Sequence, residues 1–139
     1  MKFRFFLMGF IATLTIVLIG CSSSSPDSVA EGFFRHIAAG SFDKALDLVD
    51  MTMPEGTKKS EVEYVQGKTR ASMTAMQEEI NEHKGLKSIK VEKTEYSEDK
   101  KSAQVSLLLT FKDDTTKNES VKLTKTDKGW KINLGKGGF

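Results

Sequence analysis

The sequence contains a single cysteine, Cys21, and only two prolines among its 139 residues. One thiol cannot form an intramolecular disulfide, so the fold has to be stable without the cross-links on which many small exported domains depend. The ~118 residues after the cysteine are enough to bury a core, because cross-links become usual only below about 40 residues. The lone thiol therefore needs an explanation other than a disulfide.

The chain also lacks a large excess of charge of either sign. It has 21 basic and 19 acidic residues, which gives a formal net charge of +2. Lys2 and Arg4 precede Cys21, whereas every acidic residue follows it, so the chain from Cys21 onward is formally neutral. Proteins that bind nucleic acid need clustered Lys and Arg to displace counterions. We therefore expect no nucleic-acid partner.

Only one long hydrophobic run is present, from Phe5 to Ile19, and Lys2 and Arg4 lie ahead of it. Its length suits the ~7–15 apolar residues of a secretory signal peptide and falls short of the ~20 that span a bilayer. We predict that residues 1–20 are a signal peptide that is cleaved. The alternative is an uncleaved transmembrane anchor in which the cysteine is incidental.

The tetrapeptide Leu18-Ile19-Gly20-Cys21 resembles the lipobox of bacterial prolipoproteins, with an apolar residue three places before the cysteine and a small one directly before it. The resemblance implies transfer of a diacylglyceryl group to the Cys21 sulfur, cleavage between Gly20 and Cys21, and acylation of the new amino terminus. Membrane lipid is then the expected partner, because two or more acyl chains anchor a protein stably. Residues 21–25 would form a lipidated serine tether. Ser22 in place of Asp implies outer-membrane sorting in a cell with two membranes.

Two short helices are predicted at the start of the mature domain. Ser25 can cap the first, Pro26 suits its first turn and Gly40 suits its end. Apolar residues at three- and four-residue steps give this helix one buried face. Ser41 can cap a second helix, whose apolar stripe reaches Val49.

A longer helix is predicted from Ser60 to Gly85. Ser60 and Glu63 have the spacing of a capping box, in which each side chain bonds the backbone of the other residue. Apolar residues continue at helical spacing after it. Because Gly67 lies inside this run, a kink or a division into two helices at that position is also expected.

After Gly85 the apolar period changes from about 3.6 residues to 2, and turn-forming residues separate four alternating segments. This order predicts an α+β fold, with N-terminal helices packed on one face of a curved four-stranded antiparallel sheet. The inward strand positions are expected to be Val105, Leu107, Leu109, Phe111, Val121, Leu123, Ile132 and Leu134. None of these side chains can transfer a proton, and no carboxylate is expected on this face.

Three strings, in this order along the chain, resemble the small NTF2-like lipoproteins, including the DUF4878 group: Ala39–Ala45, Ala103–Val105 and Lys128–Ile132. The likeness covers most of residues 26–134, which we take as the domain, and implies a cone-shaped fold of the NTF2-like, or cystatin-like, superfamily with a cavity between helices and sheet. It implies no activity, because that fold hosts enzymes and binding modules alike. Residues 135–139 are glycine-rich and are expected to form a flexible tail.

Six side chains are candidates for lining such a cavity: Phe33, Phe34, Tyr64, Met73, Met76 and Trp130. The simpler alternative is that they fill the core. His36 and His83 are expected at the surface or at the core boundary, because two distant histidines without further ligands do not make a metal site. The sequence has no Gly-x-Ser-x-Gly elbow. We expect neither a metal nor another cofactor.

These observations predict a membrane-anchored envelope lipoprotein whose domain is a non-catalytic binding or assembly module. Its further partner would be an envelope protein, an envelope polymer or a small apolar ligand. The alternative is an NTF2-like enzyme, an isomerase or a hydrolase, with a small hydrophobic pocket and His36 or Tyr64 as its acid or base. The two hypotheses differ in whether ionisable side chains converge in a cavity.

Overall fold

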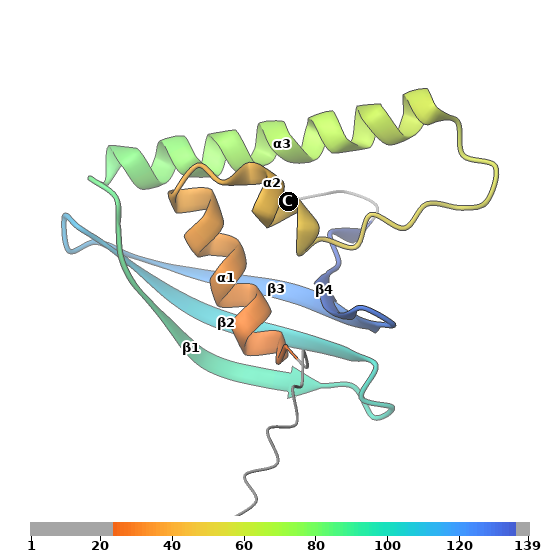
Figure 1. Cartoon of the computed structure of the whole chain (residues 1–139). Coiled ribbons are helices and arrows are strands. Elements are labelled where there is room, and N and C mark those ends of the chain that lie inside the picture. The colour runs from red at the N-terminus through yellow and green to blue at the C-terminus, as the bar shows by residue number, and fades with distance from the viewer. Residues whose placement is uncertain (1–23, 136–139) are drawn as a thin grey trace, which may run out of the picture.

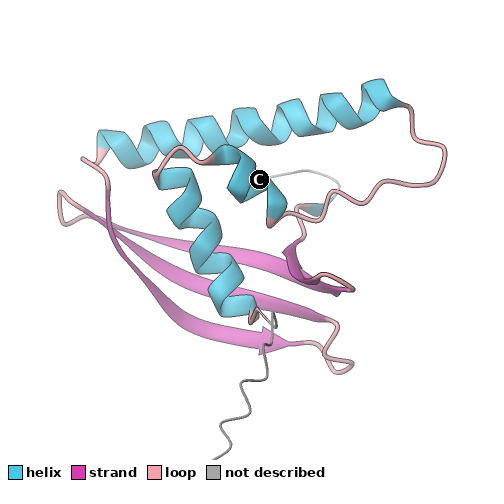
Figure 2. Cartoon of the chain, viewed as in Figure 1, coloured by secondary structure: helices cyan, strands magenta, loops and turns pink. Residues whose placement is uncertain are grey.

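The computed structural model describes residues 24–135, in which three helices pack against one open sheet (Figure 1). The elements in chain order are α1 (Pro26–Ala38), α2 (Phe42–Asp47), α3 (Lys59–Glu82), β1 (Leu86–Tyr96), β2 (Ser102–Phe111), β3 (Thr116–Thr126) and β4 (Gly129–Ile132). The strands pair in the order β1-β2-β3-β4, and every pairing is antiparallel. Figure 2 shows the helices gathered on one side of the curved sheet, which confirms the predicted α+β meander.

Several predictions concern residues outside this range. The signal peptide (1–20), the lipidation site Cys21, most of the serine tether and residues 136–139 of the tail lie outside the described residues. Between residues 24 and 135, no helix is long and apolar enough to cross a bilayer.

The first helix begins and ends as its sequence predicts. The Ser25 hydroxyl accepts a hydrogen bond from the amide three residues later at 3.2 Å, and Pro26 occupies the first turn. This bond satisfies one of the free amide groups at the helix start. Gly40 has a φ of +72°, which favours glycine, and the Ser41 amide then bonds the His36 carbonyl at 2.8 Å.

The second helix is shorter than predicted. Ser41 occupies the N-cap position as predicted, but its side chain makes no capping hydrogen bond. The helix ends two residues before Val49, which instead forms a parallel bridge to Ile132 on β4. The Asp50 amide bonds the Ile132 carbonyl at 2.8 Å, and the Ile132 amide bonds the Leu48 carbonyl at 2.7 Å. This backbone pairing replaces a further helical turn and covers the outer edge of β4.

The third helix starts one residue before its predicted cap. Lys58 occupies the cap position and no side chain bonds the first turn, so the capping box of Ser60 and Glu63 does not form. Glu63 pairs instead with Lys59 at 3.7 Å, one turn away. From there α3 continues for 24 residues through Gly67, without the predicted division.

The sheet shows the predicted alternation most clearly in β2, where every second residue from Ala103 to Phe111 is buried. The edge strand β1 is less regular. Its pairing with β2 shifts register twice, between Leu86 and Ser88 and between Val91 and Lys93. Such irregularities add local twist and bend to a strand.

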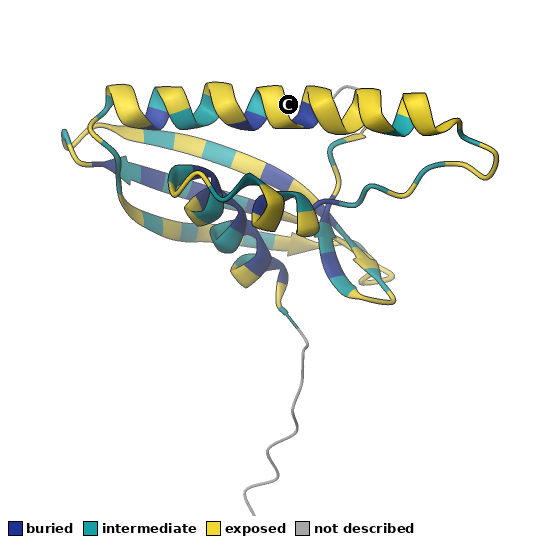
Figure 3. Ribbon diagram, turned by 45° about the horizontal axis from the view of Figure 1, so that its top comes forward, coloured by how far each residue is buried: buried dark blue, intermediate teal, exposed yellow. Residues whose placement is uncertain are grey.

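Apolar side chains fill the space between the helices and the sheet. The largest side chains that are less than 2% exposed are Phe33, Phe34, Ile37, Met73, Ile80, Leu107, Leu109, Leu123, Ile132, Val105 and Pro26. Figure 3 shows buried residues concentrated on α1 and the central strands, whereas α3 is exposed over most of its surface. Leu134 lies beyond the end of β4, so its assignment to a strand is wrong, although it is half-buried against the core.

Candidate functional site

The six predicted cavity residues do not gather around an open cavity. Phe33, Phe34 and Met73 are fully buried, and Trp130 is 8% exposed. Met76 is half-buried against the same core. Tyr64 lies on the outer side of α3 and is 67% exposed, and so it cannot line an interior cavity. The five others occupy the interior that the NTF2-like resemblance implied would be open.

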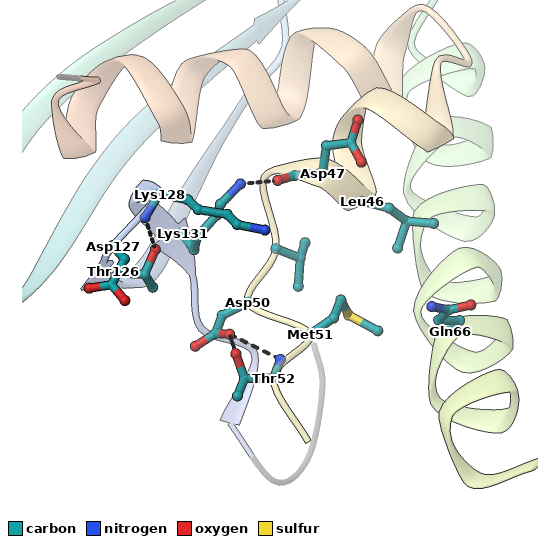
Figure 4. A pocket seen from close by; sticks show the side chains of 11 residues that line it. Leu46, Asp47, Asp50, Met51, Thr52, Gln66, Thr126, Asp127, Lys128 and Lys131 are labelled. Carbon is teal, nitrogen blue, oxygen red and sulfur yellow. Dashed lines mark hydrogen bonds between the residues drawn. The ribbon is translucent and has the colours of Figure 1, made fainter. Parts of the chain in front are cut away.

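A pocket of about 690 Å³ lies elsewhere, beside the short strand β4. Three parts of the chain form it: the end of α2 with the segment after it, one residue of α3, and the β3–β4 turn with β4 (Figure 4). The lining residues are Leu46, Asp47, Val49, Asp50, Met51, Thr52, Gln66, Thr126, Asp127, Lys128 and Lys131. None of the six predicted residues is among them.

Backbone and side-chain bonds fix the first wall of the pocket. The bridge between Val49 and Ile132 holds the segment after α2 against β4. The Asp50 carboxylate then accepts hydrogen bonds from the Thr52 amide at 3.0 Å and the Thr52 hydroxyl at 2.6 Å. This turn-forming pattern is a common use of Asp outside helices. These contacts hold the segment after α2 in place although it is neither helix nor strand.

The second wall is the β3–β4 turn. The Thr126 hydroxyl donates to the Gly129 carbonyl at 2.8 Å and accepts from the Lys128 amide at 3.2 Å. Lys131 lies on β4, two residues after Gly129. Its Nζ donates to the carbonyl of Asp47 at the end of α2. An ammonium group at this place satisfies a carbonyl that the helix leaves free. Figure 4 shows Lys131 reaching from β4 to α2, with Gln66 on the opposite side.

The charges of the pocket are not neutralised by one another. Asp47, Asp50 and Asp127 contribute carboxylates, and Lys128 and Lys131 contribute ammonium groups. Within residues 24–135 none of these five takes part in an ion pair, although eight ion-pair contacts occur elsewhere in that range. The pocket thus presents groups of both signs next to apolar side chains.

The stripe of α3 that faces the core continues past the core. Thr69 and Met73 on this stripe are buried, but Val65, one turn earlier, is 36% exposed. Figure 1 shows this half of α3 extending over the segment that joins α2 to α3. The pocket side of the molecule therefore carries exposed apolar surface on the helix above it.

A second group of ionisable side chains lies on the inward face of the sheet. Lys117 and Glu119 on β3 pair across the ladder with Leu109 and Leu107, whose side chains face the core. Lys117 Nζ is 2.8 Å from both carboxylate oxygens of Glu79 on α3 and 3.0 Å from Glu119. The prediction that this face carries no carboxylate is therefore wrong, because the charged half of β3 keeps the same register as its apolar half.

This cluster holds its lysine as an ammonium ion. Burial by itself lowers the pKa of Lys117, but its hydrogen bonds to Glu79 and Glu119 and their charges raise it by more, so the pKa lies above its ordinary value. A lysine that acts as a base or a nucleophile needs a lowered pKa instead. The geometry suits an ionic contact that ties α3 to the sheet.

Comparison with known proteins agrees with this fold. The sequence profile of the DUF4878 family, a domain of unknown function, matches residues 19–133. The chain belongs to the DUF4878 family. Among solved structures, it is similar to a Campylobacter jejuni protein whose crystal structure at 2.00 Å is named as that of a proposed NTF2-like transpeptidase. The two share 23% sequence identity and a TM-score of 0.71 over 81% of this chain and 100% of the other. This likeness shows the fold alone. Among curated proteins, no relative matches the chain.

The two histidines of the DUF4878 domain have different surroundings. His36 is half-buried on α1, and its ring makes no hydrogen bond within the described part of the chain. His83 caps α3, and its Nδ1 lies 2.7 Å from the Asp113 carboxylate and 3.0 Å from the Thr115 hydroxyl, while the ring stacks on Phe111. A hydrolase triad uses both ring nitrogens, one for the nucleophile and one for the carboxylate. Both partners of His83 contact the same nitrogen, so this group is a structural link.

Replacing Asp113 by asparagine is expected to lower stability in a pH-dependent way. The hydrogen bond from the Thr115 hydroxyl, opposed by desolvation and helped by His83, lowers the pKa of Asp113 from 3.8 to about 2. A carboxyl whose pKa is lower in the folded state stabilises the fold above about pH 4, and this stabilisation is lost as the pH falls toward 2. The melting temperature of Asp113→Asn should lie below that of the native protein at pH 7, with a gap that narrows toward pH 2.

Thermal unfolding followed by circular dichroism between pH 2 and pH 7 measures this gap. Asp114→Asn, which changes the neighbouring exposed residue, serves as the matched control. A gap of the same size at every pH would contradict the role given to the Asp113 carboxylate.

Sequence reasoning missed the pocket of the DUF4878 domain for a definite reason. In the sequence, Asp127 and Lys128 have only the chemistry of a turn, and Lys131 is a polar residue between two apolar ones, as on the solvent face of a strand. Asp47 and Asp50 flank the end of a short helix without any motif spacing. The one sequence feature that could indicate the pocket is the group of polar residues, Asp47, Asp50 and Thr52, on both sides of Val49, which bridges to β4. No group of three or more His, Cys, Asp or Glu suited to a metal ion occurs between residues 24 and 135.

Proposed function

We propose that this DUF4878 protein is an envelope lipoprotein, anchored through acylated Cys21, whose domain binds a ligand rather than catalysing a reaction. The observation that carries the proposal is the pocket beside β4. Its three carboxylates and two ammonium groups have no ionic partners of their own in residues 24–135. Ionisable groups that converge in a cavity are expected of the enzyme, and this pocket has them. We assign the pocket to binding because Asp50 bonds the turn at Thr52 and Lys131 bonds a backbone carbonyl, which are structural contacts, and because its lining within residues 24–135 includes no histidine or cysteine. Charged groups held around a concave surface are available to a ligand.

The chemistry of the pocket narrows the class of ligand. A purely apolar ligand would take water from the charges of Asp47, Asp50 and Lys131 without offering an opposite charge, and the hydrogen bonds that Asp50 and Lys131 already make offset only part of that cost. A ligand with groups of both signs and an apolar part matches the lining better, because Leu46 and Met51 lie beside these charges. A segment of peptide has this composition, and we propose a peptide or a peptide-bearing envelope polymer as the ligand.

The anchor rests on the leader sequence. The positive residues, the apolar run and the Leu18–Cys21 tetrapeptide occur in the order that prolipoprotein processing requires. Lipidation also accounts for the only thiol in the chain. Because the domain is formally neutral after cleavage, its charge supplies no net attraction to a membrane, and the acyl chains of the proposed anchor would hold it there.

A second candidate is an enzyme, and one observation favours it. Glu79 of α3 lies against Lys117 and Glu119 on the inward face of the sheet, and the structural neighbour is named as a proposed transpeptidase. The raised pKa of Lys117 argues against this candidate, since a protonated lysine is neither a base nor a nucleophile. Acylation of Cys21 would also remove the only thiol nucleophile.

Complementation of a deletion strain separates the two candidates. Gln66→Trp narrows the pocket from α3, and Ala75→Trp places the same ring on the exposed outer face of that helix as a control. We expect Gln66→Trp to lose complementation and Ala75→Trp to keep it. The double variant Glu79→Gln/Glu119→Gln removes two proton-transfer groups at nearly constant shape, and we expect it to complement.

Each variant is checked for folding by thermal unfolding before it is scored. His36→Ala and Tyr64→Phe, which remove the remaining acid–base candidates, should also complement. Full complementation by Gln66→Trp would overturn the pocket as the binding site. Loss of complementation by a folded Glu79→Gln/Glu119→Gln protein would favour the enzyme over the binding module.

A further inference from the structure

The described chain begins at one end of the sheet. Ser24 lies against the β3–β4 turn, since a Cβ added to Gly129 would come within 3.1 Å of the Ser24 hydroxyl oxygen. The first turn of α1 is tied to the last part of β1, where the Thr94 hydroxyl donates to the Asp27 carboxylate. Both contacts place the start of α1 at the end of the sheet that carries the β1–β2 and β3–β4 turns (Figure 1).

We name this region the hairpin end and define it as residues 96–101 and 125–129. The β2–β3 turn (112–115) lies at the other end, because β2 and β3 run antiparallel between the two. The ten residues of β2 at about 3.3 Å each separate the two ends by roughly 30 Å. One end of the domain is therefore close to the first described residue, and the other is far from it.

The proposed anchor lies very near the hairpin end along the chain. Only three residue steps separate Cys21 from Ser24, and a fully extended chain covers at most about 11 Å in that length. This reach is about a third of the distance between the two ends of the sheet. If Cys21 carries lipid, the tether is too short for the domain to stand away from the bilayer or to turn its far end toward it freely.

The hairpin end has a composition that suits a lipid surface. Tyr96 is 53% exposed and packs the edge of its ring on Trp130, with 6.0 Å between ring centroids. Tyrosine is favoured at membrane interfaces because its ring is apolar and its hydroxyl is polar. The charged side chains of this region are Lys100, Lys101, Lys125, Lys128, Glu98, Asp99 and Asp127. With four positive and three negative groups, the region is not repelled by a bilayer of either charge.

We infer that the hairpin end is the membrane-facing surface of the domain and contacts the headgroups of the bilayer in which Cys21 is anchored. The inference rests on the proposed lipid anchor and adds an orientation to it. It also places the pocket near the bilayer, because Thr126, Asp127 and Lys128 belong to both the pocket and the hairpin end. A ligand would then be bound close to the membrane surface.

Site-directed spin labelling of the full-length lipoprotein tests this orientation. Once Cys21 is acylated, an introduced cysteine is the only free thiol in the chain. Glu98→Cys and Lys125→Cys place a label at the hairpin end, and Thr116→Cys places one at the exposed start of β3 at the far end. The labelled proteins are reconstituted in phosphatidylethanolamine–phosphatidylglycerol vesicles that contain a lipid with a nickel-chelating headgroup.

The nickel headgroups enhance relaxation of labels that lie near them. Because the two ends are roughly 30 Å apart, we expect an enhancement at least about threefold larger at residues 98 and 125 than at residue 116. Inserting a Gly-Ser segment of about twelve residues after Ser23 gives the tether an average reach near 20 Å. This insertion should reduce the difference between the two ends.

Mass spectrometry of the reconstituted protein shows whether Cys21 carries lipid, and so separates a failure of the proposed orientation from a failure of the proposed anchor. Equal enhancement at both ends in a protein whose Cys21 carries lipid would overturn the orientation and leave the anchor in place. If the difference in relaxation enhancement between the two ends is the same with the longer tether, the short tether is not the cause of the orientation. Absence of lipid on Cys21 would overturn the proposed anchor, and the orientation with it.

Discussion

Cells that produce Cys21→Ser are expected to show no fatty-acid labelling of this protein and to accumulate it with its leader attached. The diacylglyceryl group forms a thioether with the cysteine sulfur, and a serine oxygen in its place cannot form that bond. Cleavage before residue 21 follows lipid transfer in the prolipoproteins that the Leu18–Cys21 segment resembles. We therefore expect fatty-acid labelling and leader cleavage to be lost completely and not merely reduced.

Labelling with an alkyne fatty acid and mass spectrometry of the amino terminus measure both results. Membrane fractionation would be a poor readout, because an uncleaved apolar segment at Phe5–Ile19 can hold the precursor in the membrane. Ser23→Ala, two residues away, is the matched control and should be labelled and cleaved normally. Continued labelling of the Cys21→Ser protein would show that lipid is attached elsewhere and contradict the assignment.

Truncating Phe33 to alanine is expected to lower the free energy of unfolding by about 3–5 kcal/mol, the range found for buried aromatic side chains. Phe33 is fully buried on α1, and its ring packs edge-on against Phe34 with centroids 5.5 Å apart. Domains of this size are stable by about 5–15 kcal/mol in total. The variant should therefore unfold at a much lower urea concentration than the native domain.

Urea unfolding followed by circular dichroism measures the effect. Arg35→Ala, on the exposed side of the same helix, removes a solvent-exposed pair with Glu31 and should change stability by less than about 1 kcal/mol. The loss of stability in Phe33→Ala also tests whether this ring fills the core or lines a ligand cavity. A loss below about 1 kcal/mol would mean that the ring lines an open cavity, because removing it would then leave few contacts broken.

The parts of the fold that sequence predicts well depend on local chemistry or on a strong period. The cap at Ser25 and the stop at Gly40 were confirmed because both rest on neighbouring backbone groups. The alternation along β2 was confirmed because one face of that strand is fully buried. The capping box at Ser60 was wrong because α3 begins at an exposed end of the domain, where water can satisfy the first amide groups.

The candidate sites depended on tertiary contacts and were therefore not predicted. The first half of β3 is polar, so the sequence does not show that the strand begins as early as Thr116. Once its pairing with β2 shows this, the alternation that turns Val121 and Leu123 inward also turns Lys117 and Glu119 inward. The pocket unites the end of α2 with the segment after it, one residue of α3, and the β3–β4 turn with β4, which lie up to about 85 residues apart in the chain. No spacing in the sequence brings such segments together. A surface pocket of this kind can be found only from the three-dimensional structure.

The edges of the sheet have a consequence for molecules that share a membrane. If Cys21 carries lipid as proposed, copies of the chain diffuse in two dimensions, where their local concentration is high and their strands meet side by side more often than in solution. An unprotected outer strand would then recruit the same strand of a neighbour. β1 interrupts its ladder with two register shifts and carries Lys87, Lys90 and Lys93, while the segment around Val49 covers β4. Both edges thus oppose strand-to-strand polymerisation, and the domain can be crowded on a bilayer and still act as separate molecules.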